Sequence, residues 1–205
     1  MLIDVPSLQR RLLAQGYAIG TADGVFGPRT MAALLAHVAM RPMADMQPVA
    51  DAMVKHIDRF GLRDTPTRLA NWIGQTCHET GNYRWLREIW GPTDAQRRYE
   101  GRSDLGNNQP GDGKRFMGRG LIQVTGRANY TEMAMRSGLP LVEQPELLER
   151  PDAAVLVSAI WWTRRRLNAL VDAGREDDVT RAINGGTNGI SDRRARVARA
   201  KAMLG

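Results

Sequence analysis

The segment from Gln75 to Glu88 constrains the fold most, because it places two carboxylates on either side of a helix-ending signal. Asp64–Pro66 is typical of a helix start, with an N-cap followed by proline at the first helical position. We expect this helix to end near Glu79, where Gly81 supplies a left-handed residue that closes the last turn. On one unbroken helix, residues 79 and 88 would point in opposite directions. The break at Gly81 lets both carboxylates face a common cleft.

Two carboxylates in one cleft are the groups that glycosidic bond cleavage requires, one as acid and one as base or nucleophile. Glu79 at a helix C-terminus faces the negative end of the helix dipole, which disfavours its charged form. The sequence therefore predicts Glu79 as the general acid and Glu88 as its partner.

Two other interpretations of this segment stay open. His78-Glu79 resembles the start of a zinc protease motif, but Asn82 stands where that motif needs its second histidine. With three histidines and one cysteine in the chain, we expect no metal and no cofactor. Alternatively, both glutamates are ordinary solvated surface charges.

Three motifs together resemble the family-19 glycoside hydrolases, the chitinase-like enzymes, and most closely the branch that phages use as endolysins. They are His78-Glu79-Thr80, Gly118–Thr125 and Ile183–Gly186. The resemblance runs from about residue 48 to the end of the chain. It implies a mostly helical, lysozyme-like catalytic domain that needs no cofactor. It also implies an inverting mechanism, with carboxyl groups roughly 6.5 to 9.5 Å apart.

The resemblance also implies further site residues. Thr125 would help Glu88 hold the attacking water, and a strand-like alternation over 121–125 would place Gln123 on the same face. An edge strand with one polar face is the alternative. Glu100 is a third carboxylate that could replace Glu88, or pair with Arg102 or Arg119. The predicted substrate-binding residues are Glu100, Gln123, Asn129, Tyr130 and Asn184.

Residues 1–42 are predicted to form a small helical unit with a turn at Asp23–Pro28. The pattern resembles the peptidoglycan-binding repeats fused to many wall hydrolases, which implies wall contacts from Tyr17, Asp23 and Phe26. Pro42–Pro48 reads as a linker, after which residues 48–205 form the catalytic domain. A unit of about 40 residues rarely buries enough surface alone, so we expect it to lean on that domain. The alternative is a packing appendage without a binding role.

The formal charge of +7 over 205 residues comes almost wholly from arginine and suggests an anionic partner, although a GC-rich genome also favours arginine. The arginines are scattered over several elements, so we expect no nucleic acid partner. The helix from Ser191 carries five basic residues and either contacts an anionic outer membrane or packs as a surface helix. One cysteine excludes internal disulfides. We expect a monomer.

The first residues, Met1–Leu13, lack the apolar region of a secretory signal. The expectation is therefore synthesis in a host bacterial cytoplasm and action on the cell wall in the periplasm, reached through a separate membrane pore. The predicted function is an endolysin that hydrolyses the glycan strands of peptidoglycan. A chitinase, a lytic transglycosylase, a nucleic-acid binder and a non-catalytic sugar-binding module are the alternatives.

Overall fold

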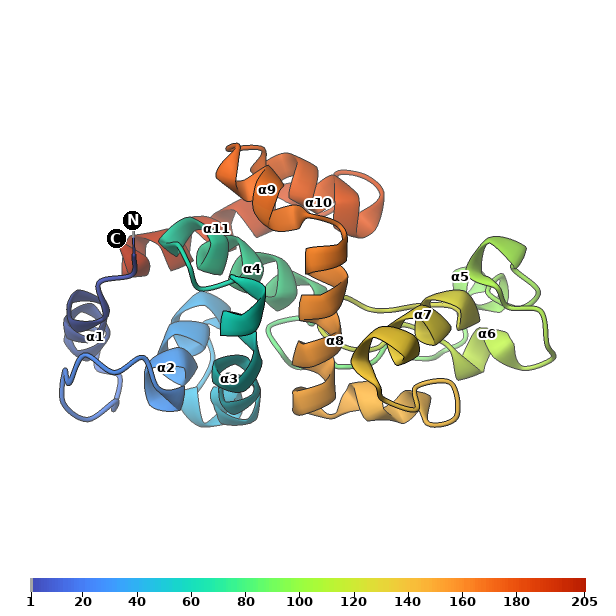
Figure 1. Ribbon diagram of the computed structural model, residues 1–205, viewed down its shortest axis with the longest axis horizontal. Coiled ribbons are helices and arrows are strands. Elements are labelled where there is room, and N and C mark those ends of the chain that lie inside the picture. Colours follow the sequence, from blue (N-terminus) through green and yellow to red (C-terminus); the bar gives the residue numbers. More distant parts are fainter. Residues whose placement is uncertain (1) are drawn as a thin grey trace.

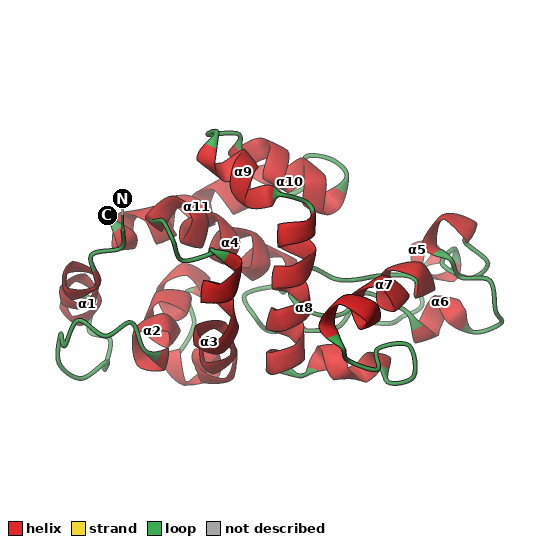
Figure 2. Ribbon diagram, viewed as in Figure 1, coloured by secondary structure: helices red, strands yellow, loops and turns green. Residues whose placement is uncertain are grey.

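Helices make up almost all regular structure in the computed structural model, which describes residues 2–205 (Figure 2). The α-helices are α1 (Val5–Ala14), α2 (Pro28–Ala39), α3 (Met43–His56), α4 (Pro66–Glu79), α5 (Asp94–Arg97), α6 (Asp112–Arg115), α7 (Arg127–Ser137), α8 (Pro151–Arg164), α9 (Leu167–Asp172), α10 (Glu176–Asn184) and α11 (Ile190–Leu204). The 3-10 helices are η1 (Ile57–Phe60), η2 (Ser103–Leu105) and η3 (Pro145–Glu149). The mostly helical prediction is confirmed. None of these helices has the length and apolarity needed to cross a bilayer.

Helices α4 and α11 form the central packed pair, with α8 beside them and smaller helices at both ends (Figure 1). Helix α4 begins as predicted, because the Thr65 side chain accepts a hydrogen bond from the Arg68 N–H at 3.1 Å. Gly74 lies in the middle of α4, where a Cβ atom would come within 2.5 Å of Val197 Cγ2 on α11. The absence of a side chain at Gly74 therefore allows the two helices to approach closely.

Helix α8 joins this pair through aromatic packing. The rings of Trp72 on α4 and Trp162 on α8 meet edge to face, with centroids 5.4 Å apart and planes at 81°. Both side chains are fully buried. The prediction that the tryptophans of α8 serve packing is therefore confirmed for Trp162, and Trp161 is also buried.

The first two helices share the apolar core of the rest of the molecule. One continuous cluster of buried side chains runs from Leu8 on α1 to Leu204 on α11. The predicted linker over Pro42–Pro48 is wrong, since helix α3 begins at Met43 and continues through Pro48. Proline inside a helix costs about 3 kcal/mol, but full burial of a methionine side chain stabilises by about 1.5–3 kcal/mol. Met46 and Met53 of α3 are both fully buried and offset that cost.

The loop-rich stretch from Gly101 to Gly120 lies at the opposite end of the molecule from α1 (Figure 1). It contains only the short helices η2 and α6. Helices α5 and α7 flank it.

We expect Gly74→Ala to lower the free energy of unfolding by about 1–3 kcal/mol, because the added methyl group would overpack the contact with Val197. Urea unfolding followed by circular dichroism would measure the change. Gly186→Ala is the control, since no atom lies within 4 Å of a Cβ built there. Equal stability of Gly74→Ala and the wild type would contradict the close approach of α4 and α11.

Candidate active site

Glu79 is the last residue of α4, and an arginine from α11 holds its side chain. Arg193 forms an ion pair with the Glu79 carboxylate and donates a second hydrogen bond to Gln75 Oε1 at 2.6 Å. Gln75 in turn donates to Thr180 Oγ1 on α10 at 3.0 Å. Only 3% of the Arg193 side chain and 16% of the Glu79 side chain are exposed. Glu79 is therefore fixed in position by a buried and doubly bonded cation, which favours its charged form and opposes the helix-dipole effect expected from the sequence.

The chain turns directly after α4 through three consecutive residues in the left-handed region. Gly81, Asn82 and Tyr83 have φ angles of 54°, 67° and 57°, and the predicted left-handed glycine is confirmed. Asparagine tolerates this conformation, whereas a bulky residue such as Tyr83 adopts it at a cost of about 1–3 kcal/mol. Tyr83 is buried, and its hydroxyl lies 3.2 Å from the Ile73 carbonyl oxygen, to which it donates. This anchoring offsets the backbone strain.

Neutral donors surround the carboxylate of Glu88. Gln96 Nε2 donates to Oε1 at 2.9 Å, and the Gly118 N–H donates to Oε2 at 3.2 Å. The Tyr99 hydroxyl is a third donor, 3.4 Å from Oε1. Burial, and then the charge of Glu88, raise the pKa of Tyr99, so this hydroxyl keeps its proton. An ionised carboxylate only accepts hydrogen bonds, and it can satisfy all three donors together.

Gln96 has its own orientation fixed by the loop before α5. Its Oε1 accepts from the N–H groups of Gly91 and Thr93, at 3.1 and 2.7 Å. Its Nε2 donates to the Ile89 carbonyl oxygen at 2.8 Å as well as to Glu88. Gln96 is 4% exposed, and the contact with Thr93 is half of a capping box. The amide cannot rotate without losing several of these bonds.

One pocket of about 230 Å³ brings Glu79 and Glu88 together. The other residues that line it are Thr80, Gly81, Trp85, Arg87, Ile89 and Gln123. The side chains of Trp85 and Ile89 are 50% and 67% exposed, so an open apolar surface lies beside the two carboxylates. An exposed indole offers a flat face on which a ring can stack.

The segment from Leu121 to Thr125 is a tight turn, and the predicted strand is wrong. Gln123 has a φ of 54°, which breaks the alternation that a strand requires. The backbone of this turn forms an isolated bridge between Arg119 and Val124 and no extended ladder. Gln123 Nε2 donates to the Gly120 carbonyl oxygen at 3.0 Å, and Thr125 Oγ1 donates to the Gln123 carbonyl oxygen at 2.9 Å. Local hydrogen bonds thus replace a ladder.

Gly118 is the point where the predicted residues of this turn meet Glu88. A Cβ atom on Gly118 would lie 2.8 Å from Gln123 Oε1 and 3.3 Å from Thr125 Oγ1. The Glu88 N–H donates to the Gly118 carbonyl oxygen at 2.8 Å, in addition to the side-chain bond described above. Gln123 and Thr125 therefore share a face without a strand, because both lie over a glycine that also binds Glu88.

Two other predicted ligands, Asn129 and Asn184, use their amides locally. Asn129 donates to the Thr125 carbonyl oxygen at 2.7 Å. Asn184 donates to the Asn188 carbonyl oxygen and accepts from the Gly186 N–H, both at 2.8 Å. Neither asparagine lines the pocket of the two carboxylates.

Tyr130 and Glu100 have structural roles that differ from those predicted. Tyr130 is fully buried, burial raises its pKa to about 12, and its hydroxyl donates to a backbone carbonyl. It cannot reach a substrate, so its predicted binding role is wrong. Glu100 accepts from the N–H groups of Gly111 and Gly113 at 2.6 and 2.8 Å. The predicted partners Arg102 and Arg119 pair with other carboxylates, because the loop supplies closer donors to Glu100.

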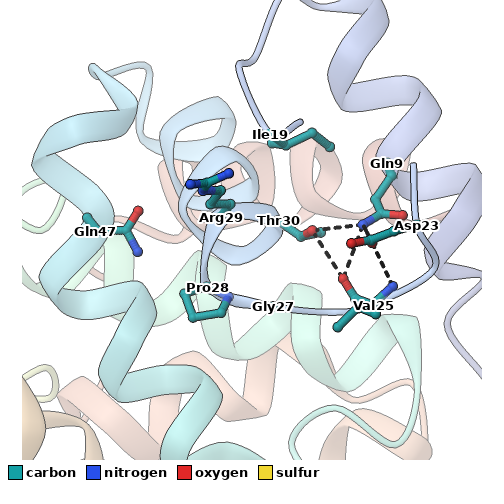
Figure 3. A pocket seen from close by; sticks show the side chains of 9 residues that line it. All are labelled: Gln9, Ile19, Asp23, Val25, Gly27, Pro28, Arg29, Thr30 and Gln47. Carbon is teal, nitrogen blue, oxygen red and sulfur yellow. Dashed lines mark hydrogen bonds between the residues drawn. The ribbon is translucent and has the colours of Figure 1, made fainter. Parts of the chain in front are cut away.

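The three residues predicted to bind the wall have different surroundings. Asp23 lines a second pocket of about 560 Å³ (Figure 3). Phe26 is 8% exposed, with the Arg63 guanidinium 4.9 Å from its ring centre. Tyr17 packs edge-on against His37, with ring centroids 6.1 Å apart. Of these three, only Asp23 lines that pocket.

The basic residues of α11 mostly contact other parts of this chain. Ion pairs join Arg193 to Glu79, Arg194 to Asp177, Arg196 to Asp192 and Lys201 to Glu176. The same helix buries Val197, Ala200, Met203 and Leu204. The helix therefore packs through one face, and most of its charges are used within the fold, which agrees with the alternative of a packed surface helix.

Three residues at this site were not among the predicted ones: Arg193, Gln96 and Trp85. Thr93 and Gln96 form the capping-box pattern, which the sequence does contain. Trp85 lies between the two carboxylates in the sequence. Arg193 gave no such signal, because 114 positions separate it from Glu79.

We expect Arg193→Met to lower the free energy of unfolding by about 3–5 kcal/mol, because it leaves Glu79 partly buried without a cation. Arg194→Met is the matched control. Its ion pair with Asp177 is exposed, so its loss should cost less than about 1 kcal/mol. Urea unfolding of both variants would measure the difference, and equal losses would contradict the role of Arg193.

Comparison with known proteins places these features in a family. Residues 3–36 match the family model of a peptidoglycan binding domain. A Haemophilus influenzae protein described as "Glycosyl hydrolase family 19 domain-containing protein" is 30% identical over 151 residues, which are 60% of this chain and 74% of that protein. An endochitinase of Arabidopsis thaliana is 32% identical over 118 residues, covering 58% of this chain and 39% of that enzyme.

Solved structures share the fold at lower identity. Chitinase C from Streptomyces griseus superposes with a TM-score of 0.68 at 19% identity, covering 88% of this chain and 95% of that one. A bacterial family 19 chitinase gives a TM-score of 0.58 at 17% identity, covering 85% and 94%. The lysozyme-like fold of these enzymes is therefore confirmed here. The chain belongs to glycoside hydrolase family 19, and it carries a peptidoglycan-binding domain in its first residues.

Proposed function

We propose that this glycoside hydrolase cleaves the β-1,4-linked glycan strands of bacterial peptidoglycan and acts as an endolysin on the wall in the periplasm. One observation carries the proposal. A single pocket holds Glu79 and Glu88 in a chain whose residues 3–36 match a peptidoglycan-binding family model. The formal charge of +7 also suits an anionic wall polymer.

Glu79 is the proposed general acid, which protonates the leaving glycosidic oxygen. The proton leaves a carboxylate behind in a largely buried position. Arg193 is already in place to stabilise that negative charge, and it needs no rearrangement because Gln75 also holds it. The buried arginine therefore stabilises the carboxylate that proton donation leaves behind, and it favours the same charged form of Glu79 before donation.

Glu88 is the proposed general base, which activates a water molecule for attack on the anomeric carbon. Gln96, Tyr99 and Gly118 orient its carboxylate through neutral donors. Thr125 lies over Gly118, whose N–H donates to this carboxylate, and we assign it to positioning the water. Attack by a held water, without a covalent intermediate, inverts the anomeric centre.

The remaining pocket residues suit an N-acetylated sugar. Trp85 offers an exposed face for a pyranose ring. The Gln123 side chain supplies a neutral amide beside the carboxylates, which suits an acetamido or hydroxyl group. We assign these two residues to substrate binding.

A chitinase is the second candidate. It is favoured by the relatives and solved structures that are themselves named chitinases. Chitin is a neutral polymer and would not use the positive charge. The rates of hydrolysis of peptidoglycan and of chitin oligomers therefore distinguish the two candidates.

We expect digestion of purified peptidoglycan to release new reducing ends, and expect Glu79→Gln and Glu88→Gln each to lower the rate by at least about 100-fold. Mass spectrometry of the products identifies the bond that is cut, and NMR of the first product identifies its anomer. Glu143→Gln is the control, because Glu143 is exposed and lies outside the pocket.

Three outcomes would contradict parts of this proposal. Anhydro ends that persist in Glu88→Gln would indicate a transglycosylase. Faster cleavage of chitin oligomers than of peptidoglycan would favour the chitinase. Failure to clear a suspension of permeabilised bacteria, despite cleavage of purified wall, would contradict the endolysin role.

We expect Gln96→Glu to move the acid limb of the kcat/KM profile to higher pH by about one pH unit. A second carboxylate within 3 Å disfavours ionisation of Glu88. A general base works only when deprotonated, so activity would be lost at a higher pH as the solution is acidified. Gln144→Glu adds the same charge at an exposed site and should leave the profile unchanged. An unmoved acid limb in Gln96→Glu would contradict Glu88 as the base.

A further inference from the structure

The second pocket, of about 560 Å³, lies outside the site of the two carboxylates (Figure 3). Its lining residues are Gln9, Ile19, Asp23, Val25, Gly27, Pro28, Arg29, Thr30 and Gln47. All except Gln47 lie within residues 3–36, which match the peptidoglycan-binding family model. Gln47 belongs to α3, so the pocket is completed by a helix outside that domain.

A buried glutamine holds one wall of this pocket rigid. Gln9 is 2% exposed, and its Nε2 donates to Asp23 Oδ1 at 2.8 Å and to Thr30 Oγ1 at 3.2 Å. The same nitrogen lies 3.1 Å from the Val25 carbonyl oxygen, and Gln9 Oε1 accepts from the Gly24 N–H at 2.8 Å. The loop is therefore preformed, and a ligand would not have to order it on binding.

Two residues of opposite charge, Asp23 and Arg29, line the pocket, and neither forms an ion pair within residues 2–205. Hydrogen bonds from Gln9 and from the Val25 N–H lower the pKa of Asp23, so its carboxylate is ionised. Both bonds end on Oδ1, and within residues 2–205 no hydrogen bond or ion pair reaches Oδ2. Arg29 is exposed, and no carboxylate of the described chain pairs with it. In Figure 3, Thr30 lies between these two side chains.

The lining suits a peptide better than a sugar. No aromatic side chain is among the lining residues, because Phe26 is buried and Tyr17 packs on His37. A pyranose ring would find no face on which to stack. Val25 is 63% exposed, so its aliphatic side chain can contact the methyl group of an alanine in a peptide ligand.

We propose that this pocket binds the short peptide stems of peptidoglycan, with the free peptide carboxylate on Arg29 and an ammonium group on Asp23. Guanidinium and carboxylate form charge-assisted hydrogen bonds that fix orientation. The first turn of α2 adds N–H groups that no side chain caps. The inference rests on peptidoglycan being the substrate. It assigns the peptide to this pocket and leaves the glycan to the pocket of Glu79 and Glu88.

The test is a calorimetric titration of the full chain with a synthetic stem tetrapeptide, L-alanyl-γ-D-glutamyl-L-lysyl-D-alanine. A second titration uses the same peptide with its C-terminal carboxylate converted to an amide. We expect the free acid to bind about tenfold or more tightly than the amide, because one charge-assisted interaction is lost. In Arg29→Gln this preference should vanish, and in Arg29→Lys it should partly survive. Arg10→Gln is the control, since Arg10 is an exposed arginine outside the pocket.

Two results would overturn the inference. One is an absence of tetrapeptide binding, or binding for which the acid and the amide are equal in the wild type. The other is a preference that persists in Arg29→Gln. A parallel titration with a tetramer of N-acetylglucosamine tests a glycan as the competing ligand, and it uses Glu79→Gln so that the tetramer is not cleaved. If the double variant Glu79→Gln/Arg29→Gln binds this tetramer more weakly than Glu79→Gln does, the inference is also overturned. Peptide binding involves no cleavage, so a failure of the proposed hydrolysis would be seen separately in the product analysis.

Discussion

The ion pair between Glu79 and Arg193 is the interaction on which the site depends, because it joins the end of α4 to α11. The two helices can approach closely only because Gly74 lacks a side chain opposite Val197. This approach brings a guanidinium within reach of a carboxylate at the helix end, where the helix dipole alone would disfavour negative charge. The packing of the core therefore fixes the electrostatics of the proposed acid.

The second carboxylate, that of Glu88, is held by hydrogen bonds without an ion pair. Glu88 pairs through its backbone with Gly118, and its side chain receives only neutral donors. Two carboxylates that line one pocket thus have unlike surroundings, a buried cation for Glu79 and amide or hydroxyl donors for Glu88. Unlike surroundings give two chemically identical groups different affinities for a proton, and the cation beside Glu79 favours the charged form of that residue.

Local signals in the sequence predicted these helices well, since the proline starts of α2 and α4 and the glycine that follows α4 act within a few residues. Local signals gave wrong predictions where contacts between residues distant in the sequence determine the structure. Pro48 suggested a linker but lies inside α3, because the burial of neighbouring side chains outweighs one lost hydrogen bond. The strand over 121–125 was wrong because Gln123 adopts a left-handed backbone conformation, and the segment forms only an isolated bridge to Arg119. The partner of Glu79 could not be predicted, because 114 positions separate the two residues.

The distribution of arginines shows how the net charge is used. Most basic residues of α11 are neutralised by nearby carboxylates and stabilise the fold, so the overall charge is a poor guide to where an anion binds. A free cation beside a cavity is more informative, because a ligand there need not displace an internal partner. Arg29 meets that condition, and the exposed Trp85 meets the corresponding condition for a sugar ring. The pocket with Arg29 is charged and lacks an aromatic ring, as a peptide ligand requires. The pocket with Trp85 has an exposed ring beside two carboxylates, as a glycan ligand requires.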